Sequence, residues 1–454
     1  MTIHKLGFEC YGEDRPSPIF VDFSYPERSW SWDSFLSLFK KVFLPKGYPH
    51  SVSSDYMEYQ IWDTIQALAS SVTGALAAQA VLIGVGVGNA QATVLSASLS
   101  WMLKNGSGMI GKILFVGIHG SQLDCNCKRW RLLADILNDG ALFLELCSPF
   151  VPNLFVPMVC VADVLRSVVS VAGGATRAAV IQHQALDNNM ADLSAKDGSQ
   201  ETLSNLLALL FNLSFVYAVT GNWTLIWFGF LLLTGLHLYA NYRAVRCLRL
   251  TTFNRNRFTI ATQSWLTARL GSQSVWSTSS DSTTHQFPSV EWVNAQEPVL
   301  GSAATPNIRL GCSVYTLPED GRLQLPALIG LFSDVQYILY CPDWRQIALG
   351  NLNRSPHVYI VLLTNCEPRT QLLAMLHAEL LTTLSKPDKD VQRSTMAKQT
   401  RQAENLAQFT EATLQMARLL LDEMTMAVRT SAEARWDLTA HHFAADEWRA
   451  AWCD

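Results

Sequence analysis

The sequence predicts a mainly α-helical protein, in which a multi-pass α-helical membrane bundle is followed by a soluble C-terminal α+β domain. Charged residues make up only 16% of the 454 residues, against about 25% in a typical soluble protein. The deficit is concentrated, because residues 64–103 and 202–242 contain no Asp, Glu, Lys or Arg. A bilayer-spanning helix needs about 20 mostly apolar residues. Each window is therefore long enough for two spans.

The first part of the chain is expected to hold an arm and then closely packed helices. Residues 1–42 are predicted to form a variable N-terminal arm, and the helical membrane domain is predicted over residues 43–260. Helices are expected at 61–88 and 90–103, where Ala, Ser and Gly are abundant. Small residues let neighbouring helices approach closely in a membrane.

Two glycine-rich stretches in this region depart from nucleotide-binding motifs. GVGVGNA lacks the third glycine of a dinucleotide fingerprint, because Asn89 occupies its place. NGSGMIGK matches most of a phosphate-binding loop, but Ile113 replaces the Ser or Thr that would bind magnesium. We therefore predict close packing or a sharp turn at the first stretch, and a turn between helices at the second.

The middle of the domain is predicted to continue as helices. Residues 128–145 have helical period, and Asp135, Asn138 and Asp139 fall on one face. That face either is solvated or turns into the bundle, where acidic residues are costly and usually functional. Three prolines within residues 146–162 predict a kinked or broken span.

The polar stretch after Ser167 is the main candidate for a binding site. It follows a run of small residues and precedes the second charge-free window. We predict that it joins the Asp135 face in one ligand site, to which it contributes Arg177, His183, Asn188, Asn189, Asp192 and Lys196. Intramembrane polar groups and broken helices are what transporter sites use.

The sequence at the end of the domain predicts how the protein is oriented in the membrane. Apolar segments at 203–219 and 223–240, split by Gly221-Asn222, predict a tight helical hairpin or one long tilted helix. Five arginines follow, which places this end in the cytoplasm by the positive-inside rule; they are Arg243, Arg246, Arg249, Arg255 and Arg257.

The composition also bears on partners and location. A net charge of −4 gives no argument for nucleic-acid binding. The ten cysteines are scattered without zinc-ligand spacing, which favours reduced thiols in an intracellular protein. The polar N-terminus shows no signal peptide. We therefore expect an intracellular membrane protein that binds neither metal nor nucleic acid.

The C-terminal part has a different character. Residues 261–305 are predicted to be a Ser/Thr-rich linker, and residues 306–454 an α+β domain. Val335–Tyr340 and Ile347–Leu352 predict a hairpin, and Val358–Leu363 predicts another strand. Two amphipathic helices are predicted afterwards, at Glu367–Leu384 and Asp390–Arg429. His377 and Glu379 lack the second histidine of a zinc-peptidase motif.

Long contiguous motifs make the chain resemble the root UVB sensitive (RUS) family, also known as DUF647 or the vitamin B6 photo-protection and homoeostasis family. They are FLPKGYPHSVSSDYMEYQIWD, GVGNAQAT, LDCNCKRWRLLADILND, SVAGGATRAAVIQHQALDNNMADLSAKDGSQET and LHLYANYRAV. The resemblance is strong over residues 43–260 and weak beyond. It implies a multi-pass membrane protein linked to vitamin B6 homeostasis, a partner from the same family, and no established catalytic residues.

These observations together predict a non-enzymatic membrane protein that binds or transports a small molecule. Given the resemblance, pyridoxal phosphate is one ligand hypothesis, because Arg177 and Lys196 can supply phosphate contacts. An oligomer with itself or another family member is a further prediction. The alternative is a membrane scaffold that recruits a protein through residues 390–429, with 183–201 as a loop between helices. A soluble enzyme is a third hypothesis, although no nucleophile–base pair stands out.

Overall fold

The computed structural model describes most of the chain and divides it into two compact units. The described residues are 4–9, 17–21, 32–86, 94–271, 286–301, 307–350, 352, 354–386, 398–400, 402–431 and 435–451. The bundle unit comprises residues 1–123 and 127–248, and the C-terminal unit comprises residues 124–126 and 249–454. The bundle unit begins with an antiparallel strand pair, β1 (His4–Glu9) and β2 (Ser17–Val21), followed by α1 (Trp32–Phe43).

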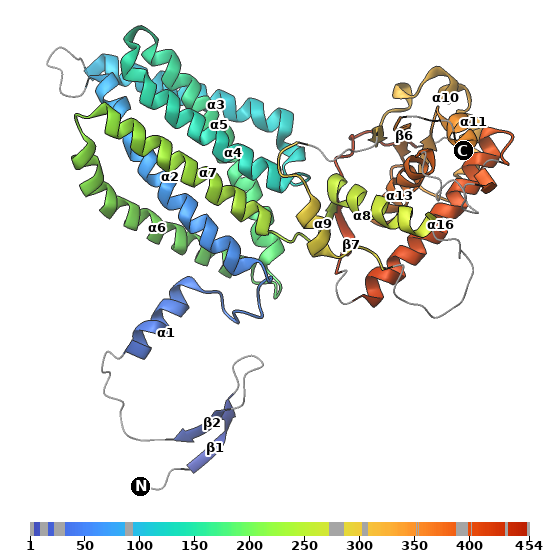
Figure 1. Ribbon diagram of the computed structural model, residues 1–454, viewed down its shortest axis with the longest axis horizontal. Coiled ribbons are helices and arrows are strands. Elements are labelled where there is room, and N and C mark those ends of the chain that lie inside the picture. Colours follow the sequence, from blue (N-terminus) through green and yellow to red (C-terminus); the bar gives the residue numbers. More distant parts are fainter. Residues whose placement is uncertain are drawn as a thin grey trace. The chain divides into compact units, whose positions relative to one another are not determined.

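Long helices that run side by side make up the rest of the bundle unit (Figure 1). Because short connections join them, successive helices are antiparallel, and α2 contacts α4, α6 and α7, whereas α5 contacts α3 and α4. The helices are α2 (Tyr56–Val85), α3 (Val94–His119), α4 (Cys127–Cys147), α5 (Phe155–Gln184), α6 (Met190–Val219) and α7 (Trp223–Cys247). The predicted helix at 128–145 and the predicted hairpin after residue 203 are confirmed.

The prediction of a turn at NGSGMIGK is wrong, because α3 continues through it as an unbroken helix. Its glycines serve the packing of α3 against α5. A Cβ atom on Gly108 would lie 2.1 Å from a carboxylate oxygen of Asp163, and one on Gly111 would lie 2.9 Å from Ser167 Oγ. Close helix approach therefore explains these glycines. Asn89 of GVGVGNA lies outside the described residues.

The proline-rich stretch is a connection that leads into one continuous helix. Two short 3₁₀ turns, Ser148–Phe150 and Pro152–Leu154, join α4 to α5. The remaining proline, Pro157, lies in the first turn of α5, where a proline leaves no intrahelical hydrogen bond unmade. The predicted break is therefore before the helix and not within it.

The C-terminal unit has a three-stranded mixed sheet. The central strand, β6 (His357–Leu362), pairs parallel with β4 (Asn307–Leu310) and antiparallel with β5 (Tyr337–Tyr340). The predicted hairpin is wrong, because the second segment forms the helix α12 (Trp344–Leu349). A second pair is parallel, between β3 (Thr252–Asn254) and β7 (Asp437–His442). The strand predicted at 358–363 is confirmed.

Helices complete the core of this unit. They are α8 (Arg255–Gly271), α9 (Val290–Gln296), α10 (Glu319–Leu323), α11 (Leu325–Leu331), α13 (Pro368–Ser385) and α16 (Leu406–Thr430). Parts of the predicted linker belong to this core, because Trp265, Leu266 and Val293 are buried in it. The apolar face of α16 is also buried there.

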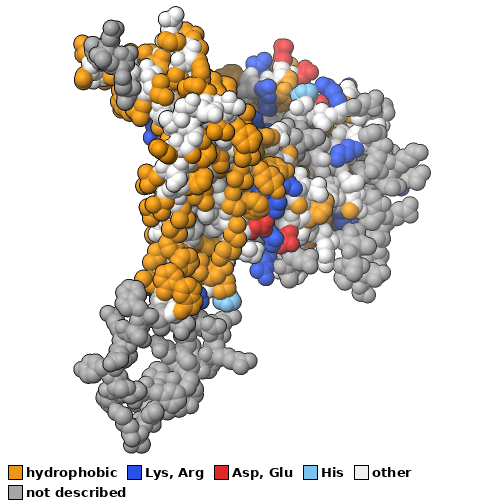
Figure 2. All heavy atoms as spheres, turned by 60° about the vertical axis from the view of Figure 1, so that its left-hand side comes forward, with side chains coloured by type: hydrophobic (Ala, Val, Ile, Leu, Met, Phe, Trp, Pro, Cys, Tyr) orange, Lys and Arg blue, Asp and Glu red, His pale blue; other side chains and the backbone are white. Residues whose placement is uncertain are grey.

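The surface of the bundle unit carries an unusual excess of apolar side chains. Figure 2 shows them covering one face of the bundle almost continuously. Val94 is 85% exposed, Ile113 72% and Leu213 69%. Among the residues that the structure describes, four helical segments have the length and apolar composition needed to cross a membrane: Tyr56–Val85, Pro152–Gln184, Met190–Val219 and Trp223–Cys247.

Candidate functional site

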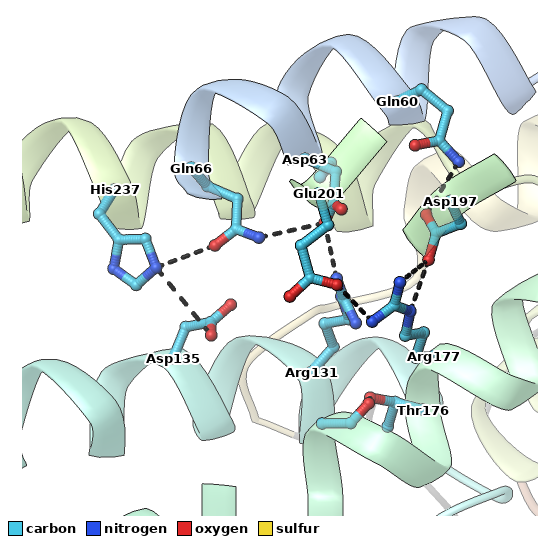
Figure 3. A network of polar contacts seen from close by, with 12 residues as sticks. Gln60, Asp63, Gln66, Arg131, Asp135, Thr176, Arg177, Asp197, Glu201 and His237 are labelled. Carbon is cyan, nitrogen blue, oxygen red and sulfur yellow. Dashed lines mark hydrogen bonds and ion pairs between the residues drawn. The ribbon is translucent and has the colours of Figure 1, made fainter. Parts of the chain in front are cut away.

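A polar network links five helices of the bundle unit (Figure 3). Its members come from segments far apart in the chain; His237 and Asp139 are buried, whereas the side chains of Arg177 and Glu201 are 35% and 48% exposed. We call it the bundle network; it consists of Gln60, Asp63 and Gln66 from α2, Arg131, Asp135 and Asp139 from α4, Arg177 from α5, Asp197 and Glu201 from α6, and His237 from α7. Carboxylates outnumber the arginines in it.

His237 is the centre of one half of the network. Its side chain is only 1% exposed, and Nδ1 lies 2.9 Å from both carboxylate oxygens of Asp139. Nε2 lies 2.9 Å from Oε1 of Gln66 and 4.0 Å from Oδ1 of Asp135. The second distance exceeds that of a hydrogen bond. Both ring nitrogens therefore face oxygen acceptors.

The partners of Gln66 and Asp139 bear on the protonation of the ring. Asp63 accepts a hydrogen bond from Arg131 at 2.6 Å and one from Nε2 of Gln66 at 3.2 Å. Because the amide nitrogen of Gln66 is held by Asp63, its oxygen faces His237. With Asp139 ionised, these contacts suit a proton on Nε2 toward Gln66 and one on Nδ1 toward Asp139, which is the imidazolium form of His237.

Arg177 is the centre of the other half. Its guanidinium bridges α5 to α6, with ion pairs to Asp197 and, at 2.6 Å, to Glu201. Gln60 of α2 donates a hydrogen bond to Asp197 at 3.3 Å. Thus the arginine on which an anionic ligand would depend already has two carboxylate partners within the chain.

The predicted site residues separate into two places. Asp135, Asp139 and Arg177 belong to the bundle network, and Asn138 beside them donates a hydrogen bond to Ser70 of α2 at 3.2 Å. The predicted polar face of α4 therefore turns into the bundle. The other five predicted residues lie where α5 ends and α6 begins.

Four of these five residues fasten the chain segment that precedes α2. Their contacts are His183 Nε2 with Asp55 at 3.0 Å, Asn189 with the Ser51 carbonyl at 3.1 Å, Asp192 with the Lys46 amide at 2.8 Å, and Lys196 with the Lys41 carbonyl at 2.6 Å. Asn188 has a φ of 53° in the connection between the helices, which asparagine tolerates better than most residues. The predicted loop at 183–201 is wrong, because α5 ends at Gln184 and α6 begins at Met190.

Sequence reasoning missed several members of the network, above all His237. A usable signal was present, because buried carboxylates on α4 need a positive partner. In residues 202–242 the only side chain that can carry a positive charge is His237. Asp63 directly precedes the charge-free window 64–103, and Arg131 lies near the start of the helix predicted at 128–145. Neither position shows a sequence pattern that marks it as part of a buried network.

A second buried ion cluster ties α3 and α5 to α4. Glu145 is buried and pairs with Lys104 at 3.1 Å and with Arg166. Asp163 also interacts with Lys104 and Arg166, so acidic and basic side chains are equal in number here, in contrast to the bundle network. Within the described residues, no three His, Cys, Asp or Glu side chains are grouped so as to hold a metal ion.

The fold and the site define a class of α-helical proteins with a charged interior and an apolar exterior. Residues 29–269 match the model of the vitamin B6 photo-protection and homoeostasis domain, and residues 286–452 match that of the root UVB sensitive protein C-terminal domain. The chain belongs to the root UVB sensitive family. No solved structure matches it.

Named relatives come from a plant and an amoeba. The chain is 36% identical over 357 residues to protein root UVB sensitive 3 of Arabidopsis thaliana, an alignment that covers 76% of this chain and 75% of that protein. It is 48% identical over 226 residues to RUS family member 1 of Dictyostelium discoideum, over 49% of this chain and 43% of that protein. The family is thus linked to vitamin B6 photo-protection and homoeostasis.

Proposed function

We propose that this chain is an integral protein of an intracellular membrane that binds a small molecule within its helical bundle and catalyses no reaction. The observation that carries the proposal is the inverted distribution of polarity. Asp139, Glu145 and His237 are buried, whereas large apolar side chains are exposed along the same helices. Water would favour the opposite arrangement, but a lipid environment favours this one.

The distribution of charge at the two ends of the bundle supports one orientation. The connections 148–154 and 220–222, at the end where α4 and α6 finish, contain no charged residue. The opposite end carries Lys40, Lys41 and Lys46 before α2 and the arginines that end α7. The positive-inside rule assigns that basic end to the cytoplasm.

Extraction of membranes tests this part of the proposal. We expect the full-length protein to stay in the pellet after a carbonate wash at alkaline pH and to be released by detergent. Exposed apolar helices leave the bilayer only when detergent covers them. Release by carbonate alone would contradict the membrane assignment, and a known peripheral protein in the same preparation serves as the control.

The chemistry of the network favours a ligand that carries a positive charge. Carboxylates are in excess there, and Asp135 lies beyond hydrogen-bond distance of the imidazolium of His237. Arg177 and Lys196, the two cations predicted to hold a phosphate, are engaged with Asp197 and the Lys41 carbonyl. Among forms of vitamin B6, the amine pyridoxamine therefore suits the network better than pyridoxal phosphate.

Ligand-dependent thermal stabilisation of the detergent-purified protein tests this choice. We expect pyridoxamine to raise the melting temperature and Asp135→Asn to weaken its binding by at least tenfold, because a charge-assisted hydrogen bond contributes about 1.5–3 kcal/mol. Asp187→Asn, in the exposed connection before α6, is the matched control and should change nothing. Stabilisation by pyridoxal phosphate alone, lost in Arg177→Ala, would show that the site takes an anion instead.

The scaffold hypothesis has less support from the structure. It requires an apolar face on the helix at 390–429 that is available to a partner. In α16 that face packs into the core of the C-terminal unit, with Phe409, Leu420 and Met424 buried. Residues 387–397, at the start of the predicted helix, lie outside the described residues.

A further inference from the structure

The helix before the bundle has an apolar face that is exposed. In α1, Trp32, Phe35, Leu36, Phe39 and Val42 recur at the three- and four-residue spacing of one helix face. Each is exposed, with Trp32 at 72%. Lys40 and Lys41 lie outside that face, in the last turn. An exposed helix with one apolar side and nearby lysines is typical of segments that lie in the membrane interface.

The helix is fastened to the bundle at its C-terminal end. Lys196 of α6 donates a hydrogen bond to the Lys41 carbonyl at 2.6 Å, and Gln200 donates one to the Phe43 carbonyl at 2.7 Å. These bonds satisfy two of the carbonyls that a helix leaves unpaired at its end. As Figure 1 shows, α1 leaves the bundle at the end where α2 begins. It therefore lies at the basic end of the bundle.

A cavity of about 1070 Å³ adjoins this junction. Its lining combines an apolar side, from Leu36, Leu44 and Pro45 among others, with four lysines and one acid. The charged residues are Lys40, Lys41, Lys46, Lys196 and Asp192. Asp192 accepts a hydrogen bond from the Lys46 amide and lies 3.9 Å from Lys196 Nζ, so the lining keeps an excess of positive charge.

We propose that α1 lies in the cytoplasmic interface of the membrane and that Lys40, Lys41 and Lys46 bind the headgroup of an anionic phospholipid in this cavity. The apolar face of α1 enters the acyl region beside the apolar surface of the bundle. The lysines reach the phosphate, as basic side chains next to a membrane helix do. The proposal rests on the membrane assignment above and identifies the lipid class that the protein recognises.

Lipid retention by the full-length protein tests the proposal. In nanodiscs or detergent, phosphatidylserine should stabilise the protein against heating, and phosphatidylcholine should not. The variant Lys40→Gln/Lys41→Gln/Lys46→Gln should weaken phosphatidylserine binding about 100-fold, since each lysine near an anionic surface contributes roughly a factor of five. Arg322→Gln/Arg345→Gln/Lys398→Gln removes the same charge from exposed positions of the C-terminal unit and should keep full affinity.

Four outcomes would overturn the inference. They are equal stabilisation by both lipids, equal loss in both triple variants, equal stabilisation by inorganic phosphate, and a disulfide dimer through Phe35→Cys, on the apolar face of α1, that is absent from the parent chain. The last would show that a second copy covers α1. Retention of both triple variants after a carbonate wash separates this inference from the membrane assignment, because loss of headgroup binding leaves the bundle in the bilayer.

Discussion

Replacing Asp139 with alanine is expected to lower the free energy of unfolding by about 3–5 kcal/mol, because it leaves the imidazolium of His237 without its main partner. The pair is buried, and Asp139 contacts Nδ1 through both carboxylate oxygens. A buried charge that loses its counter-charge keeps the full cost of desolvation. Chemical or thermal unfolding of the purified protein in one detergent measures the difference.

Two further variants decide whether the effect comes from the pair. Asp187→Ala removes a carboxylate from an exposed connection and should change the unfolding free energy by no more than about 0.5 kcal/mol. In Asp139→Leu/His237→Leu both charges are removed, and much of the lost stability should return, since apolar replacements of a buried ion pair are often neutral. A double variant that is as unstable as Asp139→Ala would contradict the assigned pairing.

Lowering the pH from 7.5 to 5 is expected to destabilise the C-terminal unit by about 2 kcal/mol through His377. This histidine is fully buried, and burial lowers its pKa to about 3. Tyr337 and Thr413 flank its two nitrogens at 3.1 and 2.9 Å. Because the Thr413 hydroxyl donates to backbone carbonyls, it accepts a hydrogen bond from Nε2–H, and Nδ1 accepts a hydrogen bond from the Tyr337 hydroxyl. The neutral ring therefore satisfies both contacts.

The direction of the pH effect follows from the pKa of His377 in the unfolded chain and in the folded chain. The unfolded chain takes up a proton at His377 below about pH 6.5, whereas the folded chain does so only near its pKa of about 3. The stability is therefore complete above pH 6.5 and is lost as the pH falls. The buried carboxyl of Glu379 has a raised pKa and acts in the opposite direction, so a variant is needed to separate the two.

Hydrogen exchange of α13 in the full-length protein makes that separation. After correction for the intrinsic rate, opening of α13 should become easier from pH 7.5 to 5 in the parent chain. In His377→Gln the destabilisation caused by His377 should be lost and the pH dependence should become smaller, because glutamine can accept from Tyr337 and donate to Thr413 without titrating. The contributions of Glu379, and of His441 and His442, whose pKa values burial lowers, should remain. An unchanged pH dependence in the variant would assign the effect to another group.

The helical part of the fold could be predicted from the sequence, because the length of an apolar segment and the helical period of its residues are local signals. The charge-free windows predicted the region of α2 and the α6–α7 hairpin, and the polar face of α4 predicted a helix with one distinctive side. At NGSGMIGK the local signal was misleading. Glycine marks a turn and a close helix contact equally well, and only the position of α5 distinguishes them.

The candidate site could be predicted from the sequence only in part, because a network of side chains depends on which helices become neighbours in the fold. Asp135 and Asp139 were found through their spacing on one helix face. His183 and Asp192 were grouped with them because they follow Arg177 closely in the chain. In the structure His183 lies at the end of α5 and Asp192 lies in the first turn of α6. Both residues therefore contact the segment before α2 and not the bundle network. Proximity in sequence was mistaken for proximity in space.

The side-chain amide of Gln66 connects Asp63 and His237, two side chains that make no direct hydrogen bond with each other. Its nitrogen is held by Asp63 and its oxygen by His237. A half-turn of this amide would lose both hydrogen bonds, so each partner helps to hold the amide in the orientation that the other requires. The amide therefore joins the Asp63–Arg131 pair to the His237–Asp139 pair, and through them α2, α4 and α7.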